Sequence, residues 1–85
     1  MFYVYVLLSI KDKNIYTGLT SNLLARLTEH KEGLVRSTRS RRPVKLIYYE
    51  AYLSKVDALR REKYLKLGGK AKTTLKKQIQ ESLLF

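Results

Sequence analysis

Residues 2–8 of the chain read FYVYVLL, an uncharged run of apolar and aromatic side chains that decides the fold. Such a run is typical of a β-strand that is covered on both faces of a sheet. The polar residues KDKN follow at 11–14, and Ile15 to Gly18 have the character of a short second strand. The two strands are therefore predicted to form a hairpin, with a loop of about five residues between them.

The segment after this hairpin has the signals of a helix, a loop and a third strand. The helix is expected over LLARLTEHK at 23–31, with Gly33 beyond its end. Its N-cap candidates are Thr20, Ser21 and Asn22. A basic loop that closes at Pro43 is expected over 34–45, and KLIYYEAYL at 45–53 is expected to be the third strand.

Two further helices are predicted in the last part of the chain. Ser54 is an N-cap candidate for a helix over 55–67, which Gly68 and Gly69 end, and a final helix is expected over 71–83. The order is thus β-β-α-β-α-α. This is the pattern of a small α+β domain in which helices flank a three-stranded, mainly antiparallel sheet. A chain of 85 residues is expected to form a single domain, 1–85.

The composition excludes several kinds of site. The absence of cysteine excludes a disulfide framework, a thiolate metal site and a thiol nucleophile. His30 is the only histidine, so a histidine-rich metal cluster is excluded as well. The apolar N-terminal run lacks a basic segment and a cleavage site, and it is far shorter than the ~20 residues of a membrane span. The expectation is a cytoplasmic protein that does not enter the membrane.

Charge is the strongest signal in the composition. Eighteen Lys and Arg residues against seven Asp and Glu give a net charge of +11. Nucleic acid is the first-choice partner for such a balance, and an anionic membrane surface or a ribosome-like assembly is the alternative. The bases are concentrated in residues 36–45 and 60–77. Phosphate contacts are expected from Arg36, Arg39, Arg41, Arg42, Lys45, Lys66, Lys70 and Lys72.

Several side chains near the predicted sheet are candidates for chemistry. Tyr3 and Tyr5 share one face of the first strand by alternation, and Tyr16 in the second strand could lie across from Tyr5. Arg26 and His30 are four positions apart, so they are neighbours on the surface of their helix. Each also has an ordinary explanation: sheet packing for the tyrosines, a surface position for Arg26 and a boundary position for His30.

Glu62 is the residue that is hardest to explain as a surface side chain. At about 100° per residue it lies between Ala58, Leu59 and Leu65 on the apolar face of its helix. A carboxylate in such a place must be paired, hydrogen-bonded or bound to a cation. One interpretation is an ion pair with a neighbouring base, and the other is a ligand to a hard divalent cation such as Mg²⁺.

Gly18 has two interpretations as well. It either ends the second strand, or it lets the chain turn closely into the following helix. The second arrangement would bring the helix N-terminus near a phosphate. Both interpretations place Gly18 at a turn of the backbone.

In this order, the candidate residues resemble the GIY-YIG endonuclease family. The chain looks like the small single-domain bacterial members of this family, and it resembles the nuclease domain of the nucleotide-excision-repair incision subunit. The first family tripeptide is similar to residues 3–5, YVY, and the second to residues 16–18, YTG. Arg26, His30 and Glu62 follow in the family's order, and TRSRRPVKLIYYE at 38–50 resembles the small bacterial members.

The resemblance implies an endonuclease that hydrolyses DNA phosphodiester bonds with one Mg²⁺ or Mn²⁺ ion. It implies a structure-selective activity in repair or recombination. By the same resemblance, Glu62 holds the ion, and Tyr5 or Tyr16 helps to activate the attacking water. Arg26 stabilises the charge of the transition state, and His30 assists proton transfer.

Two departures from the family pattern favour a different function. Leu19 stands where some members have a lysine, and no asparagine follows Glu62. They favour a non-catalytic, basic nucleic-acid-binding module on the same fold. Charge alone would also fit an RNA- or ribosome-associated factor. RNA in place of DNA, and an additional protein partner, both stay open.

Overall fold

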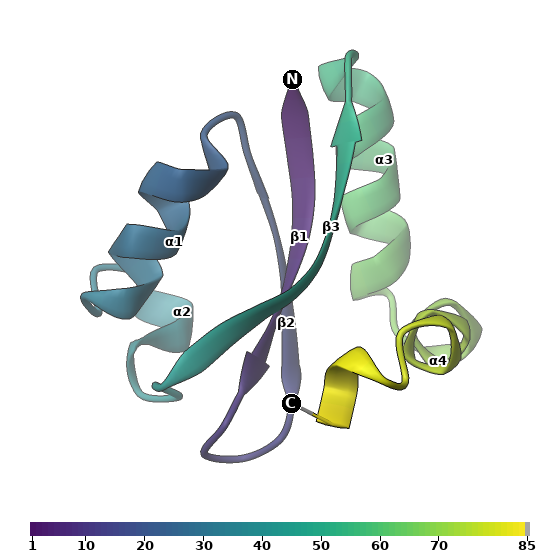
Figure 1. Ribbon diagram of the computed structural model, residues 1–85. Helices are drawn as coiled ribbons and strands as arrows, with labels where there is room; N and C mark the ends of the chain where they lie inside the picture. The colour runs from purple at the N-terminus through teal and green to yellow at the C-terminus, as the bar shows by residue number, and fades with distance from the viewer. Residues whose placement is uncertain (85) are drawn as a thin grey trace.

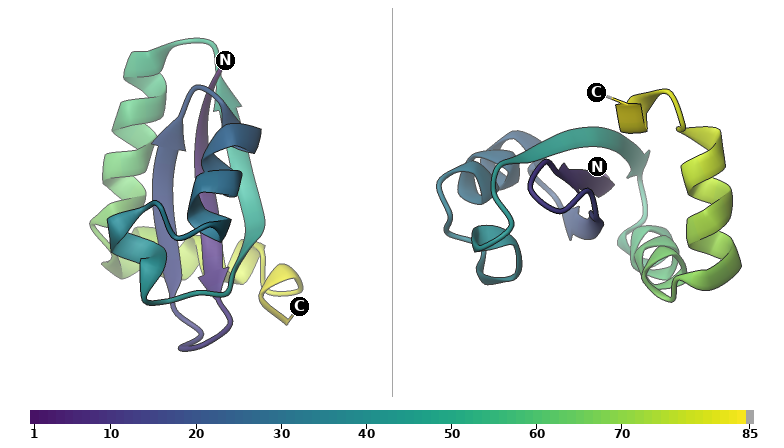
Figure 2. Two further views of the ribbon diagram at one scale, coloured as in Figure 1. Left: turned by 90° about the vertical axis from the view of Figure 1, so that its left-hand side faces the viewer. Right: turned by 90° about the horizontal axis from the view of Figure 1, so that it is seen from below.

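The computed structural model describes residues 1–84, and it confirms the predicted α+β fold with its antiparallel sheet. Strands β1 (Phe2–Ser9), β2 (Ile15–Thr20) and β3 (Val44–Tyr52) form the sheet in the order β2-β1-β3. Helices α1 (Leu23–Lys31) and α2 (Arg36–Arg39) cover one face, and α3 (Lys55–Lys66) and α4 (Gly69–Gln78) lie on the other (Figure 1). A 3₁₀ turn, η1, follows at Ser82–Leu84. The central strand β1 therefore faces two different pairs of helices, as the view from below also shows (Figure 2).

Two segments around the sheet differ from the predicted boundaries. Strand β2 continues to Thr20 and does not end at Gly18, because Gly18 pairs with Tyr5 of β1. This extension places Gly18 inside the sheet. The predicted basic loop over 34–45 contains the short helix α2 and the start of β3 at Val44. The loop therefore presents an ordered set of bases beside the sheet.

The helix ends follow the signals in the sequence at most places. Asn22 is the N-cap of α1, where its side chain accepts a hydrogen bond from a backbone N–H of the first turn. Gly68 is the N-cap of α4 and Gly69 is its first residue, two positions before the predicted start at 71, and both have positive φ, at 73° and 59°. The final helix stops before Ile79, whose φ of −116° is not helical, so its predicted end at Leu83 is wrong. Each helix in residues 1–84 is too short or too polar to cross a membrane.

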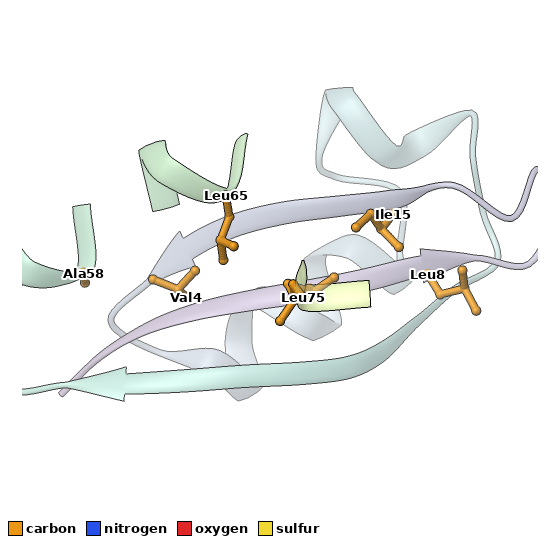
Figure 3. Close-up of a cluster of buried hydrophobic side chains, with 7 residues drawn as sticks. Val4, Leu8, Ile15, Ala58, Leu65 and Leu75 are labelled. Atoms are coloured by element: carbon orange, nitrogen blue, oxygen red, sulfur yellow. The ribbon is translucent and has the colours of Figure 1, made fainter. Parts of the chain in front are cut away.

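The face of the sheet toward α3 carries the apolar core. Ala58 and Leu65 of α3 are both buried there, and alternate residues of β1 lie beneath them. The predicted contribution of Leu59 to this face is wrong: its side chain is 44% exposed, because α3 rests on the sheet along the line through Ala58 and Leu65. The buried cluster consists of Val4, Val6, Leu8, Ile15, Ala58, Leu65 and Leu75 (Figure 3).

A polar network joins β3 to α3 at the border of this core. Arg61 donates to both carboxylate oxygens of Glu50, from Nε to Oε1 and from Nη2 to Oε2, each at 2.9 Å. The hydroxyls of Tyr48 and Tyr52 donate to the same carboxylate. Burial alone would raise the pKa of Glu50, but these hydrogen bonds outweigh it and hold the pKa below its ordinary value. Burial and the Glu50 carboxylate also raise the pKa of Tyr52 to about 12. The network therefore holds α3, the helix that carries Glu62, against strand β3.

Substituting Glu50→Gln is expected to lower the free energy of unfolding at pH 7 by about 1–3 kcal/mol, because Arg61 loses its charged, bidentate partner. The pKa of Glu50 is lower in the folded chain, so its stabilisation is complete above the unfolded value of about 4.3 and is lost as the pH falls below it. Urea unfolding at pH 7 and pH 3 measures both effects. Glu50→Gln should flatten the pH dependence, whereas the exposed control Glu81→Gln should not. Equal pH profiles for the wild type and Glu50→Gln would contradict this account.

Candidate functional site

The site is built around the hydroxyl of Tyr5, on the face of β1 opposite the apolar core. The Tyr5 side chain is fully buried, and its hydroxyl lies 2.8 Å from Nε2 of His30 in α1. Nε of Arg26, one turn earlier on the same helix, donates to this hydroxyl at 3.4 Å. Arg26 and His30, which were predicted to be neighbours on their helix, therefore both contact the hydroxyl of Tyr5 in the first strand.

His30 is a core residue, and its predicted boundary position is wrong. Its exposure is 0%, because it is enclosed by the rings of Tyr5 and Tyr16 and by α2. Nδ1 of His30 lies 2.6 Å from the hydroxyl of Thr38, which is also fully buried. Both ring nitrogens thus have partners. Thr38 was missed by sequence reasoning, since a threonine among arginines in an expected loop carries no signal that it is buried.

The electrostatics of this group favour neutral Tyr5 and His30. Burial raises the pKa of Tyr5 above its ordinary value, although the hydrogen bond from Arg26 opposes the shift. Burial also lowers the pKa of His30, and the positive charge of Arg26 lowers it further. Arg26 donates to the hydroxyl of Tyr5, which shares a hydrogen bond with Nε2 of His30, and Nδ1 of His30 shares another with the hydroxyl of Thr38. These four side chains form a continuous hydrogen-bond chain from α1 through β1 to α2.

Gly18 is required for the position of Tyr5 and not for a turn, so both of its predicted roles are wrong. It lies within β2, directly opposite Tyr5. A Cβ atom at Gly18 would stand 2.4 Å from both Cζ and the hydroxyl oxygen of Tyr5. The absence of a side chain on the edge strand therefore creates the space that the tyrosine ring occupies.

Tyr16 is the tyrosine of the site that solvent reaches. It lies on the edge strand β2 and is half-buried. It pairs with Leu7 and not with Tyr5, so the two tyrosines are diagonal neighbours rather than directly opposite. Its ring centroid is 6.4 Å from that of Tyr5 and 5.4 Å from that of His30. Tyr16 thus covers the buried pair from the open edge of the sheet.

Glu62 comes to this same edge from α3. Lys66, one turn along the helix, places its Nζ atom 3.2 Å from Oε2 of Glu62 and 5.9 Å from the centroid of the Tyr16 ring. The predicted ion pair of Glu62 therefore exists, with Lys66 as its base. The Glu62 side chain is 18% exposed, and its charge contributes weakly to raising the pKa of Tyr5, after burial and closer groups. The structure thus brings Glu62, Lys66 and Tyr16 together.

A single carboxylate is what this site offers to a metal ion. Among residues 1–84, there is no group of three or more His, Asp or Glu side chains that could hold one. Within the same residues, Lys66 engages Oε2 of Glu62, and no hydrogen bond occupies Oε1. A partly exposed carboxylate with a free oxygen fits a hard cation such as Mg²⁺, which keeps several waters and takes further oxygens from a phosphate.

The bases predicted to contact phosphate fall into three groups. Arg41 is bound internally, to the carboxylate of Asp12 at 3.4 Å and to a backbone carbonyl. Lys66 and Lys72 line a small pocket together with Tyr16. The exposed remainder comprises Arg36, Arg39, Arg42, Lys45 and Lys70. Internal binding of Arg41 compensates its charge, so it is the weakest candidate of the set.

Comparison with known proteins agrees with this geometry. The family model described as GIY-YIG catalytic domain matches residues 1–77. The UPF0213 protein of Syntrophus aciditrophicus is 43% identical over 84 residues, which cover 95% of each chain. UPF0213 protein CPE1444 of Clostridium perfringens is 46% identical over 67 residues, 78% of this chain and 71% of that protein. The solution NMR structure of the UPF0213 protein BH0048 from Bacillus halodurans aligns with a TM-score of 0.55 at 35% identity, covering 88% of this chain and 81% of that one.

Proposed function

The chain belongs to the GIY-YIG catalytic domain family, a nuclease family, and we propose that it is an endonuclease that hydrolyses DNA phosphodiester bonds with one divalent cation. One observation carries the proposal. A solvent-reachable tyrosine, a carboxylate and a lysine meet at one edge of the sheet, directly above the buried chain of Arg26, Tyr5 and His30. Hydrolysis of a phosphodiester needs an activated water, a cation at the phosphate and charge stabilisation, and this edge offers a group for each.

Tyr16, rather than Tyr5, is the residue that contacts the attacking water. Tyr5 is completely buried, and burial raises its pKa, so it stays protonated and cannot meet a substrate. Its hydroxyl instead holds Arg26 and His30 in place. Tyr5 and His30 are therefore positioning residues in this proposal, and Thr38 joins them through His30.

Arg26 is placed to meet the phosphate. Its side chain is 34% exposed, with Nε bonded to Tyr5 and Nη1 to Glu29 at 3.2 Å. Within residues 1–84, its Nη2 group has no hydrogen-bond partner, so it can donate to a phosphate oxygen. A guanidinium fixed by two of its nitrogens is preorganised for the charge that develops in the transition state.

Glu62 would hold Mg²⁺ or Mn²⁺ through its carboxylate. When bound, such an ion polarises the scissile phosphate and stabilises the leaving oxygen. Lys66 lies against the same carboxylate, so binding of the ion would displace the ammonium group or share Glu62 with it. The net charge of +11 supplies phosphate contacts that carry little sequence information, which favours selection of a substrate by its structure.

The Lys66–Glu62 ion pair also supports a second candidate function. Lys66 already compensates the charge of Glu62. In this second function, the sole role of Glu62 would be to hold α3 at the edge of the sheet. The chain would then be a non-catalytic, basic module that binds nucleic acid on the same fold. The two candidates differ in whether Tyr16 has a chemical role.

The substitution Tyr16→Phe tests the choice between them. It should lower the single-turnover rate of DNA cleavage by about 100-fold or more, because a group that moves a proton in the reaction is removed. The matched control Tyr49→Phe removes the hydroxyl of a tyrosine that is 52% exposed on β3, and it should keep the wild-type rate. Affinity for DNA should be unchanged in both variants. Equal cleavage rates for Tyr16→Phe and the wild type would overturn the proposed role of Tyr16.

A further inference from the structure

A second concavity lies on the α1 side of the sheet, next to the proposed active site. It has a volume of about 650 Å³, within the range of cavities that bind small organic groups. Its walls are largely apolar and come from β1, α1, the residue before β3 and the start of β3: Leu7, Leu27, Pro43, Val44 and Leu46. The proposed chemistry uses none of these five residues.

The strand register connects this cavity to the site. Leu7 pairs with Tyr16 on one side and with Leu46 on the other, so the three residues form one row across the sheet. Two strand spacings, about 10 Å in all, separate the ends of the row. His30, which contacts the ring of Tyr16, also lines the cavity. The cavity is therefore close enough to take a group that neighbours a phosphate held at Tyr16.

The rim of the cavity is basic. Lys31, Arg39 and Arg42 line it, and within residues 1–84 no carboxylate does. The guanidinium of Arg42 donates to the backbone carbonyls of Arg39 and Lys31, at 3.0 and 3.3 Å, so it is held in place and keeps its full charge. An apolar interior with a cationic rim is complementary to a ligand with a flat, weakly polar body and an anionic edge.

We propose that this cavity receives the base of an unpaired nucleotide next to the scissile phosphate, with the flanking phosphates on Lys31, Arg39 and Arg42. The inference rests on the proposed function, because it takes DNA as the ligand, and it narrows the substrate to DNA with an extrahelical or single-stranded nucleotide. A base that is already unpaired enters at a lower free-energy cost, whereas a paired base must first break its pair and leave the helix. The cavity thus gives the chain a means to select structure without reading sequence.

Binding in EDTA tests the cavity without reference to cleavage. The probes are two duplexes that differ at one bulged nucleotide, which carries a thymine in one and is abasic in the other. The wild type should bind the thymine bulge about 10-fold more tightly, the effect of one base contact. Leu46→Lys should abolish this preference, since it places a polar group in the cavity while adding positive charge. The same change at Leu24, which is 80% exposed on α1 away from the cavity, should leave the preference intact.

A third variant separates the rim from the interior. Arg39→Ala should weaken binding of both duplexes equally and flatten its salt dependence, because a phosphate contact is lost. Equal affinity of the wild type for the two bulges would overturn the proposal, even if Leu46→Lys failed to fold. A folded Leu46→Lys variant that still prefers the thymine bulge over the abasic bulge would also overturn the proposal, because the cavity would then take another occupant. A chain that prefers the thymine bulge but cuts no DNA would contradict the nuclease proposal and leave the cavity in place.

Discussion

Substituting Glu62→Gln is expected to lower the rate of metal-dependent DNA cleavage by about 100- to 1,000-fold, the loss that removal of one group stabilising transition-state charge produces. The amide has nearly the shape of the carboxylate but carries no charge, so it binds a hard cation much more weakly. Because Lys66 would lose its partner, a small change in stability is also expected. The measurements are single-turnover cleavage and calorimetric titration with Mn²⁺, and both should show the loss.

Glu32→Gln is the matched control, since Glu32 is an exposed acid at the end of α1. It should cleave DNA and bind Mn²⁺ as the wild type does. Far-UV circular dichroism and DNA affinity should be the same for all three proteins. If Glu62→Gln bound Mn²⁺ as tightly as the wild type, the metal would have to sit elsewhere.

Gly18→Ala is expected to have the largest effect on stability, lowering the free energy of unfolding by about 2–3 kcal/mol, a cost typical of overpacking a filled core. The added methyl group would stand 2.4 Å from the ring and hydroxyl oxygen of Tyr5. The ring cannot move aside at little cost, because it is fully buried and its hydroxyl is bonded to His30 and Arg26. For a domain of this size the melting temperature should fall by about 8–24 °C.

A double-mutant cycle identifies the cause of that loss. In a Tyr5→Ala background the ring is gone, so Gly18→Ala should cost almost nothing further. Thermal unfolding of the four proteins gives the coupling energy between the two sites. A cost of Gly18→Ala that is the same with and without the Tyr5 ring would show that the glycine serves the backbone alone.

The fold could be predicted because its strongest signals are local. The uncharged run at 2–8, the N-cap at Asn22 and the paired glycines at 68 and 69 each indicate a boundary within a few residues. The end of β2 could not be predicted, since a glycine followed by cap residues is typical of a turn. Only the pairing with Tyr5, across the hairpin, shows that Gly18 is in a strand.

The sequence named most of the residues that meet at the candidate site, but it gave no sign of Thr38 and did not predict how these residues are arranged. Sequence distance gave no reason to join Thr38 to His30, because their bond depends on how α2 packs against α1. The different roles proposed for Tyr5 and Tyr16, between which the sequence did not choose, follow from burial, which depends on which strand is central. Lys66 was predicted as a phosphate contact, and its place between Glu62 and Tyr16 follows from how α3 lies along the edge of β2.

The central claim is that this chain is an endonuclease that hydrolyses DNA with a divalent cation. Restoring metal to the EDTA-treated wild type tests this claim most directly. The protein is incubated with labelled single-stranded, duplex, flapped and bulged DNA, first in EDTA and then in excess Mg²⁺ or Mn²⁺. RNA of the same structures serves as a parallel set. We expect no cleavage in EDTA. On adding either ion we expect cleavage that is fastest on DNA with an unpaired nucleotide. Unbroken DNA in every structure with both ions, or equal cleavage in EDTA, would contradict the claim.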